Sequence, residues 1–286
     1  MSVQEKLPLN QVVCGDSLEV MRRWPSDSVD LIWTSPPYDN RRSYGGVEAK
    51  DYLTWLAPFF QEFKRILTPH GNILFNIANK WQNWKTHTYT YKIPVICEGL
   101  GLRFIEDIIW HQLTGYPNRP LKMIDVWEHI YWFNKVGGAP TFYHDNIRRK
   151  YASSTLKRFS SKFKNHHTVD DELRGNWKGD YEFRQANPLG ALPFNLIALA
   201  VETRNKYKHP AVYPLTLAEW VVKGWSKEGD IVLDPFMGSG TTAEACINNH
   251  RRWVGVEMRE DYCDLIRRRT TPLMAQTCLE HTMINS

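Results

Sequence analysis

The segment Thr34-Ser35-Pro36-Pro37-Tyr38 contains groups that could bind an amino group. It follows an apolar, strand-like run at 29–33, so it forms a turn at the end of a strand. Its two prolines fix φ and carry no N–H, which makes the turn rigid and leaves its carbonyl oxygens able only to accept hydrogen bonds. A rigid turn of acceptors suits the amino group of a substrate.

A second segment, 234–242, reads Asp-Pro-Phe-Met-Gly-Ser-Gly-Thr-Thr and could bind a cofactor. It follows another apolar run at 231–233, and its glycines let the backbone turn tightly against a ligand before a helix begins at Ser239 or Thr241. Residues 238–243 also match the G-x-G-x-x-A pattern of dinucleotide enzymes. No lysine follows the final glycine, which excludes a Walker phosphate loop.

The carboxylate that opens this second segment favours a different nucleoside cofactor. Asp234 lies directly at a strand end, where it suits the cationic amino-acid end of S-adenosylmethionine better than a pyrophosphate. Glu257, at the end of the next strand, is expected to hold the ribose hydroxyls. The alternative for Glu257 is a surface carboxylate paired with Arg259 or Arg251.

An α/β framework is needed to bring the two segments together. Apolar runs and helical spacings alternate along the first hundred residues and again from residue 216. We predict one doubly wound, mostly parallel sheet, with both segments at its carboxyl edge near the point where the strand order reverses. The expected domains are a catalytic half of the core at 1–115, the last core strands and a basic module at 116–199, and a cofactor-binding half at 200–286. The predicted strands are 11–14, 31–33, 72–77, 104–110, 126–133, 231–233 and 253–257, and the predicted helices are 49–67, 216–225, 241–249 and 260–269.

Composition narrows the class of protein. No apolar run approaches the roughly 20 residues that span a bilayer, and residues 1–9 lack the apolar core of a secretory signal, so we expect a soluble, cytoplasmic protein. The five cysteines are scattered without a C-x-x-C pair, which predicts neither disulfides nor zinc. His166 and His167 have no further ligand at metal-binding spacing, so no metal is expected.

Positive charge is concentrated between residues 148 and 178. Nine lysines and arginines stand there against three acidic residues, whereas the whole chain carries a net charge of +5. Aromatic residues, among them Tyr151 and Trp177, are interspersed with these cations. The composition fits either a surface for a polyanion such as nucleic acid or a solvated basic loop.

In this order, the two segments resemble the motifs of the β-class DNA amino-methyltransferases, whose catalytic half precedes the target recognition region and the cofactor motif. Gly15-Asp16-Ser17 is similar to the family segment whose Asp reaches the cofactor adenine, and Lys208-His209-Pro210-Ala211 resembles the motif that contacts the methionine part. The matches leave about 115–200 as the recognition region. The resemblance implies S-adenosylmethionine as cofactor, double-stranded DNA as partner, a bacterial, archaeal or phage source, and a separate restriction endonuclease in the same system.

The resemblance and the basic composition together give three sets of expected site residues. Catalysis is expected of Ser35, Pro36, Pro37 and Tyr38. Cofactor binding is expected of Asp16, Thr34, Lys208, His209, Pro210, Asp234, Pro235, Phe236, Met237, Gly238, Ser239, Gly240, Thr241, Thr242 and Glu257. DNA binding is expected of Arg41, Arg42, Arg148, Arg149, Lys150, Lys157, Arg158, Lys162 and Lys164.

The chemistry of an exocyclic amine gives the catalytic turn a mechanism. The lone pair is delocalised into the ring, so acceptors must bind both amino hydrogens, and we expect these to be Ser35 Oγ and the Pro36 carbonyl. Tyr38 is expected to stack on the base after it has left the helix. No cysteine follows a proline, so we expect direct, in-line transfer without the covalent intermediate of carbon-5 cytosine methylation.

The target base and the substrate class leave alternatives open. Thr-Ser-Pro-Pro-Tyr resembles the cytosine N4 enzymes, whereas Asp or Asn before the prolines usually accompanies adenine N6 methylation. The alternatives are therefore adenine N6 methylation of DNA, methylation of RNA or protein, and a non-catalytic nucleic-acid-binding protein on a relic core.

Overall fold

The computed structural model describes residues 5–37, 52–113, 123–160, 186–201 and 213–284. These residues belong to two compact units. The first, Met1–Tyr143 with Phe194–Ser286, contains the main sheet. The second, His144–Pro193, contains a 3-10 helix η1 (His144–Ile147) and the helix α4 (Ser153–Ser160).

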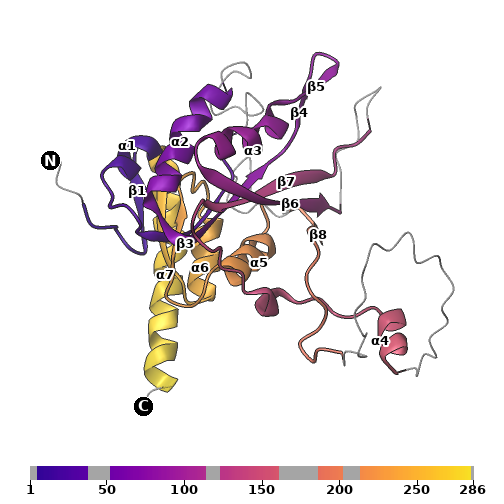
Figure 1. Cartoon of the computed structure of the whole chain (residues 1–286). Coiled ribbons are helices and arrows are strands. Elements are labelled where there is room, and N and C mark those ends of the chain that lie inside the picture. The colour runs from indigo at the N-terminus through magenta and orange to yellow at the C-terminus, as the bar shows by residue number, and fades with distance from the viewer. Residues whose placement is uncertain (1–4, 38–51, 114–122, 161–185, 202–212, 285–286) are drawn as a thin grey trace. The chain divides into compact units, whose positions relative to one another are not determined.

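One sheet of eight strands organises the first unit (Figure 1). Seven strands run in one direction and β7 alone runs against them, since it pairs antiparallel with both of its neighbours. The predicted α/β fold with a mostly parallel sheet is therefore confirmed. In spatial order the strands are β1 (Gln11–Cys14), β10 (Arg252–Glu257), β9 (Ile231–Asp234), β2 (Val29–Thr34), β3 (Leu67–Ile77), β7 (Trp127–Lys135), β6 (Leu102–Gln112) and β8 (Leu196–Leu199).

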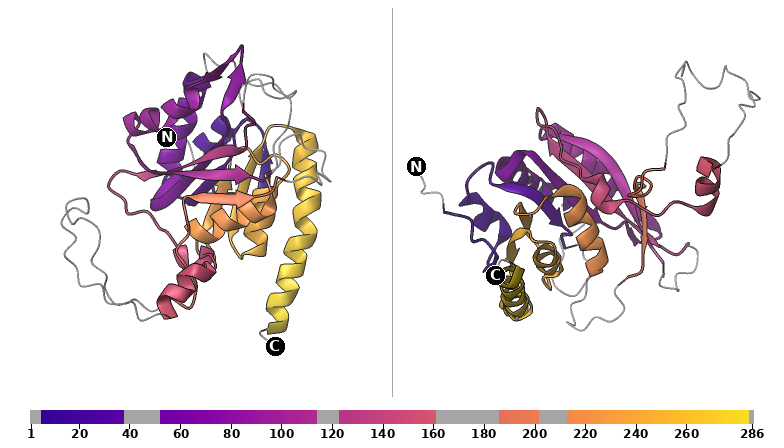
Figure 2. Two further views of the ribbon diagram at one scale, coloured as in Figure 1. Left: turned by 90° about the vertical axis from the view of Figure 1, so that its right-hand side faces the viewer. Right: turned by 90° about the horizontal axis from the view of Figure 1, so that it is seen from below.

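Two groups of helices cover the sheet (Figure 2). The helices α1 (Ser17–Arg22), α2 (Tyr52–Ile66) and α3 (Tyr89–Gly99) pack in sequence on one side. The helices α5 (Leu215–Trp225), α6 (Thr241–Asn248) and α7 (Glu260–Ile284) pack in sequence on the other. This arrangement is the doubly wound architecture that the alternating pattern predicts.

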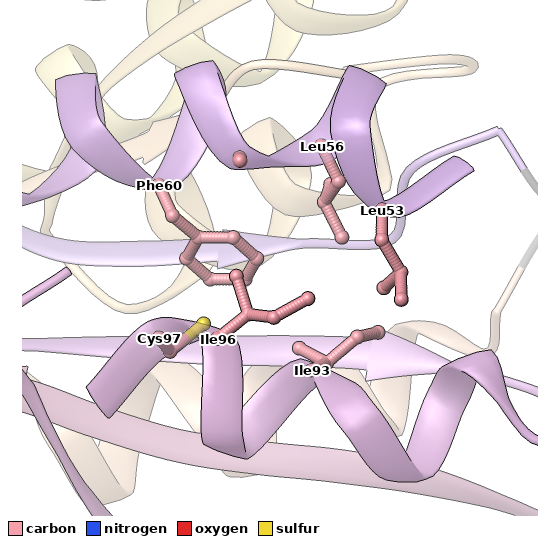
Figure 3. Close-up of a pocket in the computed structure, with 7 residues that line it drawn as sticks. Leu53, Leu56, Phe60, Ile93, Ile96 and Cys97 are labelled. Carbon is pink, nitrogen blue, oxygen red and sulfur yellow. The ribbon is translucent and has the colours of Figure 1, made fainter. Parts of the chain in front are cut away.

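The contact between α2 and α3 shows how the core is built. Leu56, Phe60 and Phe63 recur at helical spacing on α2 and are fully buried. A small pocket between the two helices is lined by Leu56, Phe60 and other apolar side chains (Figure 3). Its lining contains no charged side chain and no side-chain oxygen or nitrogen that could bind a nucleoside cofactor, so we regard it as a packing gap. The lining residues are Leu53, Leu56, Ala57, Phe60, Ile93, Ile96 and Cys97.

The sequence analysis missed α3 because Pro94 interrupts its helical pattern. Proline lacks the N–H that would bond the carbonyl four residues earlier, which is that of Thr90. Tyr131 of β7 supplies the missing donor, since its hydroxyl donates to the Thr90 carbonyl at 3.1 Å. Burial raises the pKa of Tyr131, so this hydroxyl stays protonated and able to donate.

Other elements also differ from the sequence prediction. Helix α7 continues to Ile284, past the predicted end at residue 269, although it contains Pro272. The two-stranded hairpin of β4 (Lys80–Gln82) and β5 (Lys85–His87) and the strand β8 were not predicted. No helix in the described part of the chain is long and apolar enough to cross a membrane.

Strands β9 and β2 lie side by side at the centre of the sheet, where the direction of winding changes. From β2 the chain passes through α2 to β3 on one side, and from β9 it passes through α6 to β10 on the other. Crevices form at the carboxyl ends of strands at such a point. The fold therefore directs the two chemically interesting segments toward the same crevice.

Candidate active site

The catalytic turn and the cofactor segment meet directly at the carboxyl ends of β2 and β9. Thr34 is the last residue of β2 and Asp234 is the last residue of β9. Their strands are paired, with Ile32 opposite Leu233. The Thr34 hydroxyl donates a hydrogen bond of 2.8 Å to Asp234 Oδ1 across 200 residues of sequence. The two segments are thus not only close together, as predicted, but joined by a direct hydrogen bond.

The Asp234 carboxylate is 1% exposed and accepts four hydrogen bonds. Besides Thr34, the Phe236 N–H donates to Oδ1 at 3.1 Å, and the hydroxyls of Tyr213 and Thr242 donate to Oδ2 at 3.2 and 2.5 Å. Burial raises the pKa of Asp234, while these donors lower it by stabilising the charge. Both oxygens are thus already engaged within the protein, which makes Asp234 an organising residue. Its direct contact with a cofactor stays a prediction.

The turn after β9 depends on glycines. Gly238 and Gly240 have φ of 55° and 83°, in the left-handed region that favours glycine. A Cβ on Gly240 would also lie 3.1 Å from Ile266 Cγ1 of α7. Helix α6 begins at Thr241 without a side-chain cap, in agreement with one of the two predicted starts. The turn therefore places backbone that carries no Cβ at the carboxyl end of β9.

Glu257 holds this turn from the end of β10. Its Oε2 accepts the Gly238 N–H at 2.9 Å and its Oε1 accepts the Arg259 N–H at 3.0 Å. Burial raises the pKa of Glu257. The alternative of an ion pair with Arg259 or Arg251 is wrong, because the Arg259 guanidinium binds Asp261 and that of Arg251 binds Ser226 and the Asn249 carbonyl.

Asp16 lies at the same edge of the sheet as Glu257. The β1 residue Cys14 is opposite Glu257 in the parallel pairing of β1 with β10, and Asp16 follows two residues later. Its Oδ1 caps α1 by accepting the N–H groups of Leu18 and Glu19 at 2.9 and 3.0 Å. The next residue, Ser17, donates to the Pro235 carbonyl at 2.5 Å. Asp16, Glu257 and the cofactor turn therefore lie together at the carboxyl edge of the sheet.

A hydrogen bond from α2 supports the catalytic turn. Ser35 and Pro37 are half-buried, and Pro36 is buried. The Tyr52 hydroxyl donates to the Pro37 carbonyl at 3.2 Å, and the Tyr52 ring packs on that of Tyr89 with centroids 4.8 Å apart. Sequence reasoning missed Tyr52, because nothing in its local pattern distinguishes it from an ordinary core aromatic.

Arg269 is a second contributor that the sequence analysis missed. Its side chain is 7% exposed and forms an ion pair with Glu244 of α6 at 2.5 Å. Its Nη1 donates to the Ser239 carbonyl at 2.7 Å, in the middle of the cofactor segment. The only sequence signal is spacing, since Arg269 follows Ile266 by one helical turn and therefore shares its inward face.

The predicted DNA-binding residues in the second unit divide into two kinds. Arg148 donates to Asp145 Oδ1 at 2.6 Å and to the Gly190 carbonyl at 2.8 Å, and Arg149 donates to the Leu192 carbonyl at 3.0 Å. These arginines thus stabilise their own unit, whereas Lys150 and Lys157 are exposed. Outside the described residues lie Tyr38, Arg41, Arg42, Lys162, Lys164, Lys208, His209 and Pro210, together with the Arg158 side chain. Contact of all these residues with DNA or cofactor stays a prediction.

No metal centre is found in the part of the chain that the structure describes, where no group of three or more His, Cys, Asp or Glu could hold an ion.

The chain is similar to known DNA methyltransferases. The family model of the N6 and N4 methyltransferases, described as DNA methylase, matches residues 29–268. The type II methyltransferase M.BglII of Bacillus subtilis is 31% identical over 91% of this chain and 68% of its own length. The type II methyltransferase M.Cfr9I of Citrobacter freundii is 31% identical over 91% of this chain and 88% of its own.

Solved structures agree with this result. The PvuII DNA methyltransferase, described as cytosine-N4-specific, superimposes with a TM-score of 0.67 and 20% identity, covering 93% of this chain and 91% of its own. A DNA modification methylase of Thermus thermophilus, complexed with S-adenosyl-L-methionine, gives a TM-score of 0.58 with 27% identity, covering 92% and 95%. Because the identity with the PvuII enzyme is only 20%, that likeness shows the fold alone.

Proposed function

Because this chain belongs to the DNA methylase family of N6 and N4 methyltransferases, we propose that it transfers a methyl group from S-adenosylmethionine to the N4 amino group of cytosine in duplex DNA. That it is a DNA methyltransferase of the restriction-modification type follows from the family model and from the type II relatives. The choice of base and the roles of single residues belong to the proposal.

The observation that carries the proposal is the hydrogen bond from Thr34 to Asp234. It connects the last residue before the catalytic turn to the first residue of the cofactor segment. A methyl donor bound against one segment and an amino group bound by the other would meet in line, and such positioning is the main source of catalysis for a direct transfer.

The residues at this crevice fit S-adenosylmethionine. Glu257 uses each carboxylate oxygen for one backbone N–H, and each oxygen can accept a second hydrogen bond from a ribose hydroxyl. Asp16 caps α1 through Oδ1, which leaves Oδ2 for the adenine end. Gly238 and Gly240 allow the backbone to approach the ligand closely. When bound, the cofactor would supply an electrophilic methyl group on a sulfonium; its transfer would break the methyl–sulfur bond, release S-adenosylhomocysteine and require the amino nitrogen to lose one proton.

Ser35 and the prolines prepare the acceptor nitrogen. Ser35 Oγ and the Pro36 carbonyl accept the two amino hydrogens, which localises the nitrogen lone pair and turns it toward the methyl group. Tyr52 holds the Pro37 carbonyl and so fixes the turn. Tyr38 stacks on the base, which must leave the helix for its amino group to reach the crevice.

Ser35 before the two prolines favours cytosine. Adenine N6 methylation is the alternative, since the family model covers both amino groups. A separate restriction endonuclease that the modification protects against is a further part of the proposal.

The test is to incubate the protein with methyl-labelled S-adenosylmethionine and unmethylated duplex DNA, and to identify the labelled nucleoside by mass spectrometry. We expect N4-methylcytosine, and an equimolar RNA competitor should not reduce the signal. N6-methyladenine would overturn the choice of base while keeping the chemistry. Label in RNA or protein alone would contradict DNA as the substrate.

Ser35→Ala separates the catalytic role from cofactor binding. We expect kcat to fall by about 100-fold, in the range found when one positioned polar group is removed from an active site. The dissociation constant for S-adenosylmethionine, measured by calorimetry, should not change. An unchanged kcat would remove Ser35 Oγ from the mechanism.

A further inference from the structure

The hairpin of β4 and β5, residues 80–87, projects from the edge of the sheet that carries the catalytic turn (Figure 1). It follows β3, which is the neighbour of β2, and begins three residues after the carboxyl end of β3 at Ile77. The hairpin therefore leaves the sheet at the carboxyl edge that also holds the catalytic turn, although neither the proposed mechanism nor the predicted DNA-binding residues include it.

Trp84 at the tip of the hairpin is exposed to an unusual degree. Its side chain is 72% exposed, although burial of an indole ring is strongly favourable. The one ring that packs on it in the described structure is Trp81, edge-on with centroids 5.9 Å apart. A large apolar side chain supported from one side and open on the other is suited to contact a partner.

The backbone at the tip places a bulky residue in a conformation that favours glycine. Asn83 and Trp84 have φ of 52° and 63°, so the two-residue loop has the positive dihedrals of a type I′ turn. Asn is common at the first position, but glycine is preferred at the second, and a bulky residue there is unfavourable. Strained residues of this kind cluster at functional sites.

Charge in this region favours a polyanion. The exposed cations are Lys85 in the hairpin and Lys92 on α3, whereas Lys80 of the hairpin is buried. No Asp or Glu occurs between Ala78 and Cys97. Lys85 is exposed beside Trp84, so an aromatic face and a cation are presented together. Base stacking and phosphate neutralisation require this combination.

We propose that the 80–87 hairpin is a DNA-binding element, in which Trp84 stacks on a base that is unstacked when the target leaves the helix and Lys85 neutralises a phosphate. The inference rests on the proposed function as a DNA methyltransferase. It assigns a contact at the catalytic edge itself, separate from the basic stretch of the second unit.

The first test uses Trp84→Gly and Trp84→Phe with a fluorescein-labelled duplex that the unchanged protein methylates. Glycine relieves the positive φ, so the thermal midpoint should stay the same or rise. The dissociation constant for DNA should nevertheless increase at least fivefold, the lower end of what one base–aromatic stack contributes (about 1 kcal/mol). Trp84→Phe should keep most of the affinity for DNA, because the phenyl ring can still stack on a base. The dissociation constant for S-adenosylmethionine should not change in either variant.

The second test uses Lys85→Ala with Lys227→Ala as the matched control. Lys227 is also exposed but lies just before β9, at the opposite edge of the sheet. We expect Lys85→Ala to reduce the slope of log affinity against log salt by about 0.9, the value for one phosphate contact. Lys227→Ala should leave the slope unchanged.

The outcomes separate this inference from the function on which it rests. If the unchanged protein methylates DNA but Trp84→Gly and Lys85→Ala bind it equally well, the hairpin is not a DNA contact and the methyltransferase function stands. If Trp84→Gly changes only the oligomeric state in sedimentation, the hairpin binds a second copy of the chain. If the unchanged protein methylates no DNA, both the inference and the function fail.

Discussion

Replacing Thr34 by valine removes the hydrogen bond that connects the catalytic turn to the cofactor segment. Valine has nearly the shape of threonine, so the change deletes the donor and little else. The bond of 2.8 Å ends on a buried carboxylate, and hydrogen bonds to charged groups contribute about 1.5–3 kcal/mol. We therefore expect the free energy of unfolding to fall by that amount and the thermal midpoint by about 3–10 °C. Thr34→Ser keeps the hydroxyl and is the matched control.

The loss should depend on pH in a defined direction. Burial raises the pKa of Asp234 above its ordinary value of 3.8. The stability that protonated Asp234 contributes is therefore fully present below pH 3.8, and it is lost as the pH rises through the pKa of the folded state. Thr34 is one of the donors that lower this pKa, so valine raises it further. The stability difference between Thr34→Val and Thr34→Ser should thus be small at acidic pH and grow toward neutral pH, as Asp234 ionises.

The assay is chemical denaturation of both variants across this pH range, with steady-state methylation at neutral pH. A displacement of the turn by about 1 Å would lower kcat by up to ~100-fold. If valine and serine give the same stability at every pH and the same kcat, the bond between the two segments contributes nothing, and the reasoning about the site is refuted.

Three further predictions test the support of the site. Gly240→Ala should destabilise the protein by about 1–3 kcal/mol and weaken S-adenosylmethionine binding in calorimetry, because Gly240 combines a positive φ with a close contact to α7. Gly137→Ala is the control and should lower the free energy of unfolding less, since the φ of Gly137 is also positive but its Cβ would meet nothing within 4 Å. Equal losses of stability in the two variants would mean that the contact with α7 is irrelevant. Tyr131→Phe should lower stability to urea by about 1–3 kcal/mol, since the α3 carbonyl left by Pro94 loses its donor; an unchanged midpoint would show that water replaces the hydroxyl. Tyr52→Phe should lower kcat without changing cofactor affinity, because the ring packing is kept and the support of the catalytic turn is lost; an equal change in both constants would contradict a positioning role.

The sequence predicts the parts of the fold that local patterns encode. The strands of the central sheet follow from short apolar runs, and the crevice follows from the rule that ligands bind at the carboxyl ends of strands where winding reverses. The resemblance to the DNA amino-methyltransferases is confirmed, because the family model matches residues 29–268, a range that includes both segments.

The remaining features depend on contacts between distant residues. Helix α3 contains Pro94, and only Tyr131, which is 41 positions from the Thr90 carbonyl that it binds, shows how the helix accommodates the proline. The β4–β5 hairpin has Asn-Trp where Asn-Gly would have signalled a turn. Tyr52 and Arg269 act on the site from helices whose own pattern is that of ordinary core packing. In each case the interaction partner cannot be identified before the fold is known.

The central position of β2 has a consequence during protein synthesis. Its neighbour β9 leaves the ribosome some 200 residues later, yet Leu31, Ile32 and Trp33 are fully buried in the finished sheet. A nascent chain that ends before Ile231 therefore exposes an apolar strand with an open hydrogen-bonding edge, which is a template for aggregation. The apolar β2 strand stays exposed and prone to aggregation for most of the time that the chain is being translated. The yield of the folded enzyme in a cell should therefore depend on chaperones that bind the incomplete chain.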